Sequence, residues 1–159
     1  MRKPPAPRGP RPSRFERVPG IDYGDLEDYY GYALRRAQVA AFEAFFLATA
    51  GAGITPPRFT ALVVLEANPG IAQSLLGRAL GTARSGAMLL TDWLVDRGLA
   101  ERRHREHDGR VWGLYLTPRG AALLARLRRR LRSREKVFIG RLSAAERAEL
   151  KRLLIKLAG

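Results

Sequence analysis

The densest group of side chains able to do chemistry lies in the stretch RRHREHDGR, at residues 102–110. His104, His107 and Asp108 are residue types that can coordinate a divalent metal. The neighbouring arginines would repel such a cation, and a hairpin tip supplies no further residues to orient the ligands. The same arginines suit a polyanion. The stretch therefore poses a choice between a metal site, a solvated loop and a surface that contacts phosphates.

Enzymatic chemistry finds little support elsewhere in the sequence. It offers no paired carboxylates in an apolar setting, no Ser–His pair with a base and no phosphate-binding loop. The absence of cysteine excludes disulfides, thiol nucleophiles and thiolate metal sites. We therefore expect no enzyme, no cofactor and no resident metal.

The charge balance indicates a polyanionic partner. The 159 residues include 29 Lys and Arg against 15 Asp and Glu, which gives a net charge of +14 and an isoelectric point near 11.3. Such an excess favours nucleic acid over a membrane surface. Neither a signal peptide nor a transmembrane stretch is recognisable, so we expect a cytoplasmic protein without a membrane partner.

Several elements must position the charged stretch. Residues 1–20 hold six of the ten prolines and six basic residues, a composition typical of a disordered basic arm. Apolar spacings of three and four predict one long helix over residues 25–50, which GAG at 51–53 ends. Thr55 is then expected to cap a helix that begins with Pro56 and Pro57.

Two short helices and a hairpin follow. AQSLLGRALG predicts a helix with Leu75, Leu76, Ala79 and Leu80 inward, and a second helix is expected from Thr82 to Asp96, with a tight glycine-containing turn between them. Leu99–Arg105 and Val111–Leu116 alternate as two strands, with Trp112, Leu114 and Leu116 on one face. Thr117-Pro118 begins another helix, and Ser143 with Glu146 predicts a capping box for the last one.

In this order, the elements form a winged helix with additional helices at both ends. The sequence resembles the MarR family of bacterial transcription regulators over Leu26–Leu157. The segments that carry this resemblance are ITPPRFTALVVLEANPGIAQSLLGRALG, VDRGLAER, Asp108-Gly109-Arg110, which matches the family's D-x-R signature, and LTPRGAALL. The resemblance implies a mainly α fold with a small β-hairpin wing (α+β), a winged helix-turn-helix flanked by N- and C-terminal dimerisation helices. It implies a single domain over 21–159, with the winged helix at about 55–117 and dimerisation helices at about 25–50 and 118–157.

The resemblance also assigns a DNA site. The helix from Thr82 to Asp96 would read the major groove, and the wing Arg110, oriented by Asp108, would enter the minor groove, where negative potential attracts a guanidinium. Gly86, Met88 and Leu89 stand where the family often has small hydroxyl or basic residues. The expected DNA-binding residues are Thr82, Arg84, Ser85, Gly86, Met88, Arg103, Arg105, Asp108 and Arg110. Phosphate contacts are expected from some of Arg58, Arg78, Arg102, Arg103, Arg105 and Arg119, each of which could equally be a solvated charge.

Family membership would further imply a homodimer on a palindromic operator and a small-molecule effector. Tyr32, Arg36 and Phe59 are candidate effector contacts, since an aromatic wall and a guanidinium suit an aromatic carboxylate or an aromatic acyl-CoA; ordinary packing and a surface charge are equally open readings. A ligand-responsive repressor of transcription is therefore the first hypothesis for function. The alternative is an architectural protein that binds DNA with little sequence preference, which the basic arm and the apolar residues near Arg84 favour.

Overall fold

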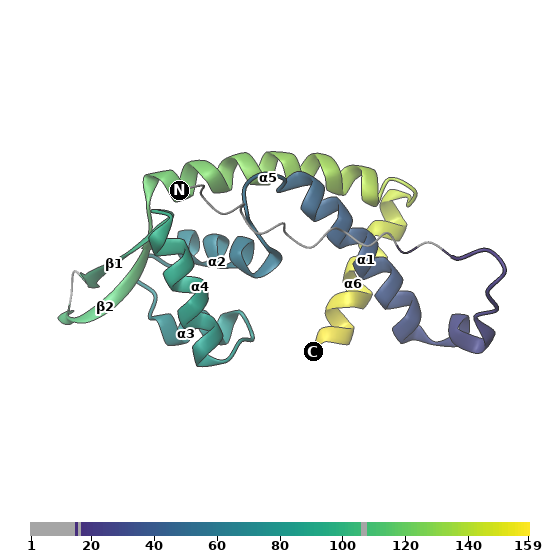
Figure 1. The fold of residues 1–159 in the computed structure, drawn as a ribbon, viewed down its shortest axis with the longest axis horizontal. Helices are drawn as coiled ribbons and strands as arrows, with labels where there is room; N and C mark the ends of the chain where they lie inside the picture. Colours follow the sequence, from purple (N-terminus) through teal and green to yellow (C-terminus); the bar gives the residue numbers. More distant parts are fainter. Residues whose placement is uncertain (1–14, 16, 106–107) are drawn as a thin grey trace, which may run out of the picture. The chain divides into compact units, whose positions relative to one another are not determined.

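The computed structural model describes residue 15, residues 17–105 and residues 108–159, with the side chains of residues 105–111 left outside the description. The predicted basic arm therefore lies mostly outside the described residues. The mainly helical fold with a small hairpin is confirmed (Figure 1). The elements are a 3-10 helix η1 (Gly24–Asp28), α1 (Tyr30–Ala48), α2 (Pro56–Ala67), α3 (Gln73–Ala79), α4 (Arg84–Asp96), β1 (Ala100–Arg105), β2 (Asp108–Leu116), α5 (Pro118–Phe138) and α6 (Ala144–Ala158).

The chain divides into two compact units. One consists of Met1–Gly53 with Arg130–Gly159, and the other of Ile54–Arg129. The second, which we call the winged-helix unit, contains α2, α3, α4, the hairpin and the first part of α5. The predicted single domain over 21–159 and its inner boundaries remain a prediction.

Leucines form the core of the winged-helix unit. Every helix of the unit contributes, and the side chains that are almost completely buried are Leu62, Leu65, Leu76, Leu94, Leu124 and Leu127. Each buried leucine stabilises the fold by about 1.5–3 kcal/mol relative to an exposed one. The expected inward positions of Leu75 and Ala79 are wrong, because Leu75 is 48% exposed and Ala79 is exposed as well. With only seven residues, α3 buries one narrow face, and Leu76 occupies it.

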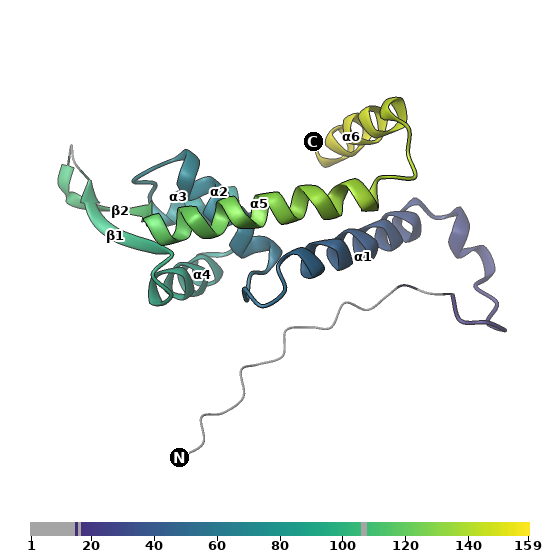
Figure 2. The same cartoon turned by 90° about the horizontal axis from the view of Figure 1, so that it is seen from above.

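The hairpin is joined by a third extended segment. Ala100 pairs with Leu116 and His104 with Trp112, and the register shifts between His104 and Arg105. Ile71 forms an isolated antiparallel bridge with Leu114, whose N–H donates to the Ile71 carbonyl at 3.0 Å. The two strands run side by side in both views (Figure 2). Sequence reasoning missed this bridge.

A threonine hydroxyl fixes the junction between the hairpin and α5. Thr117 Oγ1 donates to the Gly98 carbonyl at 2.6 Å and accepts from the Gly120 N–H at 3.0 Å. Thr117 thus caps α5, as the Thr-Pro pair predicted. A Cβ at Gly120 would collide with the Leu99 carbonyl. The absence of a side chain there lets the first turn of α5 lie directly against the residue before β1.

The N-terminal helix is shorter than expected. The sequence predicted one helix over 25–50, but η1 and α1 are separated by Tyr29, whose backbone is extended at φ −91° and ψ 121°. Asp22 accepts from the Gly24 N–H at 2.9 Å and so begins a tight local turn. Tyr29 donates from its hydroxyl to Asp25 at 3.0 Å, which holds the break.

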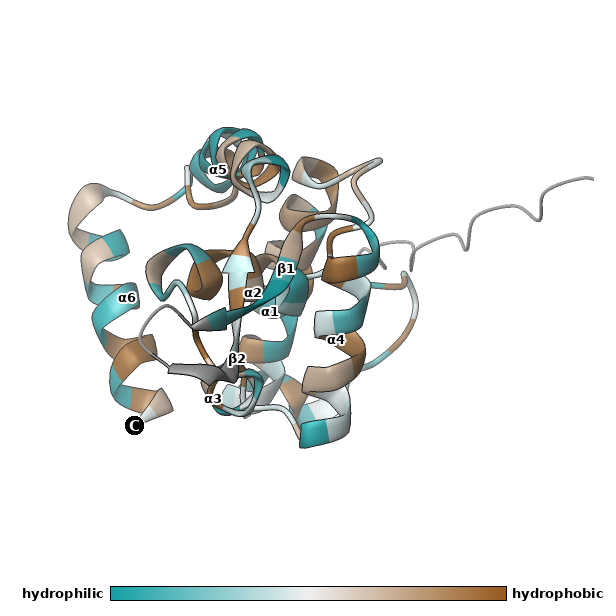
Figure 3. Ribbon diagram, turned by 90° about the vertical axis from the view of Figure 1, so that its left-hand side faces the viewer, coloured by the Kyte–Doolittle hydropathy of each residue, from teal (hydrophilic) through white to brown (hydrophobic). Residues whose placement is uncertain are grey.

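The last helix shows the predicted capping box. Glu146 Oε2 accepts from the Ser143 N–H at 2.7 Å, and the Glu146 N–H donates to Ser143 Oγ at 3.3 Å. None of the residues of α6 is buried, although hydrophobic residues recur along it (Figure 3). Among the described helices, none combines the length and the apolar character that crossing a bilayer requires.

Candidate nucleic-acid interface

Close contact between glycine and alanine sets the packing of α3 on α4. A Cβ at Gly77 would lie 2.8 Å from the Cβ of Ala87, well inside van der Waals contact. Both residues are buried. The missing side chain of Gly77 therefore lets the two helices approach closely enough to form the helix-turn-helix.

The turn between these helices corrects one expected boundary. The Thr82 N–H donates to the Gly77 carbonyl at 3.0 Å and the Gly81 N–H to the Arg78 carbonyl at 3.1 Å, with Gly81 at φ +60°. These two bonds form a Schellman motif that ends α3. Because Thr82 completes the preceding cap, α4 begins at Arg84 and not at Thr82.

The first half of α4 presents one exposed face. Arg84 and Ser85 are exposed in its first turn, and Met88, one turn later, is 50% exposed. Leu89 beside it is exposed as well. Gly86 differs: it is half-buried, and a Cβ there would collide with the hydroxyl of Thr82. The face thus combines a guanidinium, a hydroxyl and two apolar side chains.

A groove with two arginines among its lining residues lies beside this face. Its volume is about 640 Å³, and it is lined by Gln73, Ser74, Gly77, Arg78, Thr82, Arg84 and Ala87. Arg78 and Arg84 supply positive charge from two helices. Sequence reasoning missed Gln73 and Ser74, although their place at the start of α3, where backbone N–H groups have no helical acceptor, was a usable signal.

Two of the expected phosphate contacts are engaged within the unit. Arg102 pairs with Asp92 at 2.5 Å and reaches Gln73 at 3.4 Å, so it ties β1 to both α4 and α3. The guanidinium of Arg58 lies 3.7 Å from the ring centroid of Trp93, and that of Arg97 lies 3.9 Å from the same centroid. Desolvation, and then repulsion by Arg97, lowers the pKa of Arg58.

The wing residues are described only in part. Arg103 lies over the ring of Tyr115 at 4.0 Å and pairs with Glu101 at 3.1 Å, with half of its side chain exposed. The side chains of Arg105, Asp108 and Arg110 lie outside the described residues, as does His107. His104 stacks on Trp112, and the described part of the chain holds no group of three metal-ligating side chains.

Two of the three expected effector contacts come together in the other unit. Tyr32 lies 5.7 Å from Phe15 in an edge-to-face arrangement, and the guanidinium of Arg36 lies within 6 Å of both rings. The hydroxyl of Tyr32 is buried and has no hydrogen-bond partner among the described residues. Phe59, the third candidate, belongs to the winged-helix unit, where it is half-buried.

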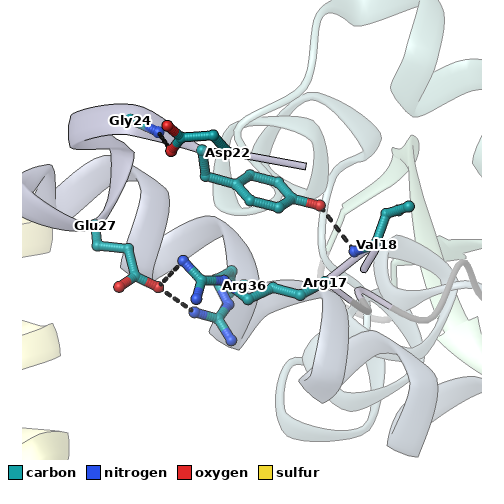
Figure 4. Close-up of polar contacts among 7 residues, drawn as sticks. Arg17, Val18, Asp22, Gly24, Glu27 and Arg36 are labelled. Atoms are coloured by element: carbon teal, nitrogen blue, oxygen red, sulfur yellow. Dashed lines mark hydrogen bonds and ion pairs between the residues drawn. The ribbon is translucent and has the colours of Figure 1, made fainter. Parts of the chain in front are cut away.

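An acidic side chain completes the cluster around Arg36. Glu27 Oε1 lies 2.7 Å from a nitrogen of Arg17 and 3.6 Å from one of Arg36, so one carboxylate oxygen serves two guanidiniums (Figure 4). The Val18 N–H donates to the hydroxyl of Tyr23 at 3.0 Å, which folds the segment carrying Arg17 back on itself. Sequence reasoning missed Arg17 and Glu27, since their pairing depends on this fold.

Comparison with known proteins gives consistent matches. A model of the MarR family matches residues 52–111. A protein of Thauera aromatica, described as regulating transcription of the hcr operon, is 36% identical over 136 residues, which cover 85% of this chain and 82% of the relative.

Solved structures agree over a similar extent. The transcriptional repressor CouR bound to a 23-mer DNA duplex superposes with a TM-score of 0.80 at 35% identity, covering 87% of this chain and 99% of CouR. CouR bound to p-coumaroyl-CoA gives 0.77 at 34% identity, covering 87% and 97%.

Proposed function

The chain belongs to the MarR family of transcriptional regulators, and on that basis we propose that it is a cytoplasmic, homodimeric repressor that binds a palindromic DNA operator. A small aromatic acid or its CoA thioester releases it from that operator. The observation that carries the proposal is the exposed face of α4, which adjoins a groove with Arg78 and Arg84. The similarity to CouR, a repressor bound to DNA in one structure and to p-coumaroyl-CoA in another, supports it.

Base reading is assigned to the first half of α4. Arg84 can donate two hydrogen bonds to a guanine, and Ser85 can contact either a base or a phosphate. Met88 provides apolar contact for a thymine methyl group. We assign Thr82 and Gly86 to a close approach between DNA and the protein backbone at this turn. A side chain at Gly86 would collide with the Thr82 hydroxyl, so glycine keeps the turn compact.

The wing supplies the second group of contacts. We assign Arg110 to the minor groove with Asp108 as its orienting partner, and Arg103 and Arg105 to phosphates. The assignments of Asp108 and Arg110 follow from the match of Asp108-Gly109-Arg110 to the family's D-x-R signature. Arg103 suits the role because half of its side chain remains exposed beside Tyr115.

Exposed hydrophobic side chains favour a homodimer. α6 exposes Leu150, Leu153, Leu154, Ile155 and Leu157, and α5 ends on exposed Val137 and Phe138. Apolar surface of this extent marks an interface. A two-fold dimer would place two copies of α4 about 34 Å apart, which matches successive major grooves on one side of a palindrome.

The cluster of Tyr32 and Arg36 is the proposed effector site, and the role of Phe59 stays a prediction from the sequence. Its aromatic rings suit an aromatic body, and its guanidiniums suit a carboxylate or the phosphates of CoA. In this account Glu27 holds Arg17 and Arg36 while the effector is absent, so an acidic effector competes with it. An effector acts only if it binds more tightly to a conformation that fits the operator poorly.

Comparing affinities for two duplexes tests the proposal. The DNA upstream of the protein's own gene should bind at least about 10³-fold more tightly at physiological salt than a scrambled duplex of equal length. Arg110→Ala should weaken specific binding by about 1–3 kcal/mol. Arg132→Ala, which removes the same charge from α5, serves as the matched control. A ratio near one would support the architectural alternative instead.

Effector binding is tested by thermal unfolding with aromatic acids and their CoA thioesters, p-coumaroyl-CoA among them. A ligand that binds the folded state raises the unfolding midpoint. Glu27→Gln should enlarge that shift, because it removes the internal carboxylate, whereas Arg36→Gln should abolish it. Equal shifts in both variants would place the effector elsewhere.

A further inference from the structure

The hairpin carries a stacked aromatic pair that covers no core. His104 and Trp112 face each other across β1 and β2, with ring centroids 4.1 Å apart and planes tilted by 37°. Trp112 is 57% exposed. Cross-strand stacking restricts the rotamers of both rings, so the indole is preorganised for a contact before a partner binds.

The face on which this pair lies is defined by its neighbours. Side chains alternate along a strand, so Trp112 shares a face with Leu114, and His104 with Arg102. Leu114 is buried in the core, and Arg102 reaches Asp92 of α4 and Gln73 of α3. The pair lies about 7 Å farther along the strands, at two residues of about 3.4 Å each. The pair therefore lies on the hairpin face that packs on the helix-turn-helix, but beyond the last residues of that face with a described contact to a helix.

We infer that His104 and Trp112 form an apolar contact surface for the sugar–phosphate backbone of double-stranded DNA. This inference rests on the DNA-binding function proposed above. Gln73, which Arg102 touches on the same face of the hairpin, also lines the groove with Arg78 and Arg84. DNA bound at that groove would pass beside the pair, and the deoxyribose rings offer the apolar surface that an exposed indole needs.

Charge selects DNA over another copy of this chain as the occupant. Residues 54–129 contain twelve arginines and six acidic residues. A second winged-helix unit would bring the same positive charge to the same place, and like charges repel. A polyanion with apolar sugars suits both the positive charge of the winged-helix unit and the exposed indole.

The inferred contact has its own energetic signature. Deoxyribose rings carry no sequence information, so Trp112→Ala should weaken operator and scrambled DNA to the same extent, by about tenfold, or roughly 1.4 kcal/mol. Because no counterion is released, the salt dependence of binding should stay unchanged. Loss of an arginine that contacts a phosphate should instead reduce that slope by about one unit. Trp112→Phe, which keeps an aromatic ring, should retain most of the affinity.

Intrinsic fluorescence tests the contact without altering it. Trp93 and Trp112 are the only two tryptophans, so in Trp93→Phe protein the emission comes from Trp112 alone. A duplex of about 25 base pairs, long enough for two half-sites, is added at low salt while binding is followed independently by anisotropy of a DNA label. Acrylamide quenching of Trp112 should decrease as the DNA saturates. Trp112→Phe protein is the matched control, and quenching of its Trp93 should not change.

The outcomes separate this inference from the function on which it rests. If the duplex binds but quenching of Trp112 stays the same, the contact is refuted and the regulator function stands. If the wild-type protein binds no duplex at low salt, both proposals fall. Protection of Trp112 that rises with protein concentration in the absence of DNA would identify a second copy as the occupant and overturn the inference.

Discussion

The packing of α3 against α4 predicts the effect of a single added methyl group. Gly77→Ala would introduce a Cβ 2.8 Å from the Cβ of Ala87, where carbon atoms normally lie 3.5–4.0 Å apart. The helices must separate to accommodate it. Both the stability of the winged-helix unit and the placement of the exposed face of α4 should therefore suffer, and removing the opposing methyl group should restore both.

The magnitude follows from two opposing effects. Overpacking a core costs about 1–3 kcal/mol, while alanine in place of glycine within a helix returns about 1 kcal/mol. Gly77→Ala should therefore destabilise by up to about 2 kcal/mol. Ala87→Gly alone should cost about 1–2 kcal/mol through helix propensity and a lost buried methyl group. In the double variant the propensities cancel and the collision disappears, so the coupling between the two sites should be at least about 1 kcal/mol.

Urea unfolding of the wild type, both single variants and the double variant measures this coupling, and DNA affinity of the same four proteins supplies a second measurement. Gly77→Ala should weaken DNA binding more than Ala87→Gly, because it changes the spacing of the helices. The double variant should recover most of the affinity. Strictly additive free energies of unfolding would refute the close contact as the origin of the effect.

Three further predictions follow from individual contacts. Replacing Arg102 and Asp92 by alanine, singly and together, should reveal a coupling of about 0.5–1 kcal/mol in unfolding experiments, the range for a partly exposed pair; no coupling would contradict the observed ion pair. Gly120→Ala should lower the urea midpoint, since its Cβ meets a backbone carbonyl that cannot turn aside. Hydrogen bonds from Ser143, first from its backbone N–H and then from its side chain, hold the pKa of Glu146 below its ordinary 4.5. The ionised Glu146 carboxylate therefore stabilises the protein above that pH and loses its effect as the pH falls through the lowered pKa, and Glu146→Gln, which cannot ionise, should flatten the stability profile in that range.

Helix ends were predictable because their signals are local. Pro56 and Pro57 occupy the first turn of α2, where missing N–H groups cost little. Gly51 and Gly98 adopt positive φ just after α1 and α4, at 76° and 64°. Each of these helix boundaries depends on one residue and its immediate neighbours. A single sequence therefore contains the information needed to predict where these helices begin and end.

Contacts between distant residues were not predictable in the same way. Arg102 pairs with a residue ten positions away and touches another 29 positions away, and neither spacing has a periodicity. The partnership exists because β1 packs across two helices at once. The cluster of Arg17, Glu27 and Arg36 has a similar origin, since it requires the segment before η1 to fold back along α1.

Exposure of apolar residues follows from the lengths of neighbouring elements. The alternation in β2 correctly places Trp112 and Leu114 on one face, yet Leu114 is buried and Trp112 is not. The strands continue beyond the residues that α3 and α4 cover. An alternating pattern specifies a face but not how far the covering helices reach along it. Leu75 is exposed for a related reason, because α3 buries only the side that meets α2 and α4.

Adjacent arginines show why net charge does not give the number of phosphate contacts. Arg102 and Arg103 are neighbours in β1, and alternation directs them to opposite faces of the hairpin. One is held by Asp92 and Gln73, so binding a phosphate would require breaking an ion pair. The other pairs only with Glu101, two residues away on its own strand, and still keeps half of its side chain exposed over Tyr115. A charge of +14 therefore comprises arginines that hold the interface together and arginines that remain available to DNA. The salt dependence of binding counts only the second kind, since only a guanidinium that meets a phosphate displaces a counterion.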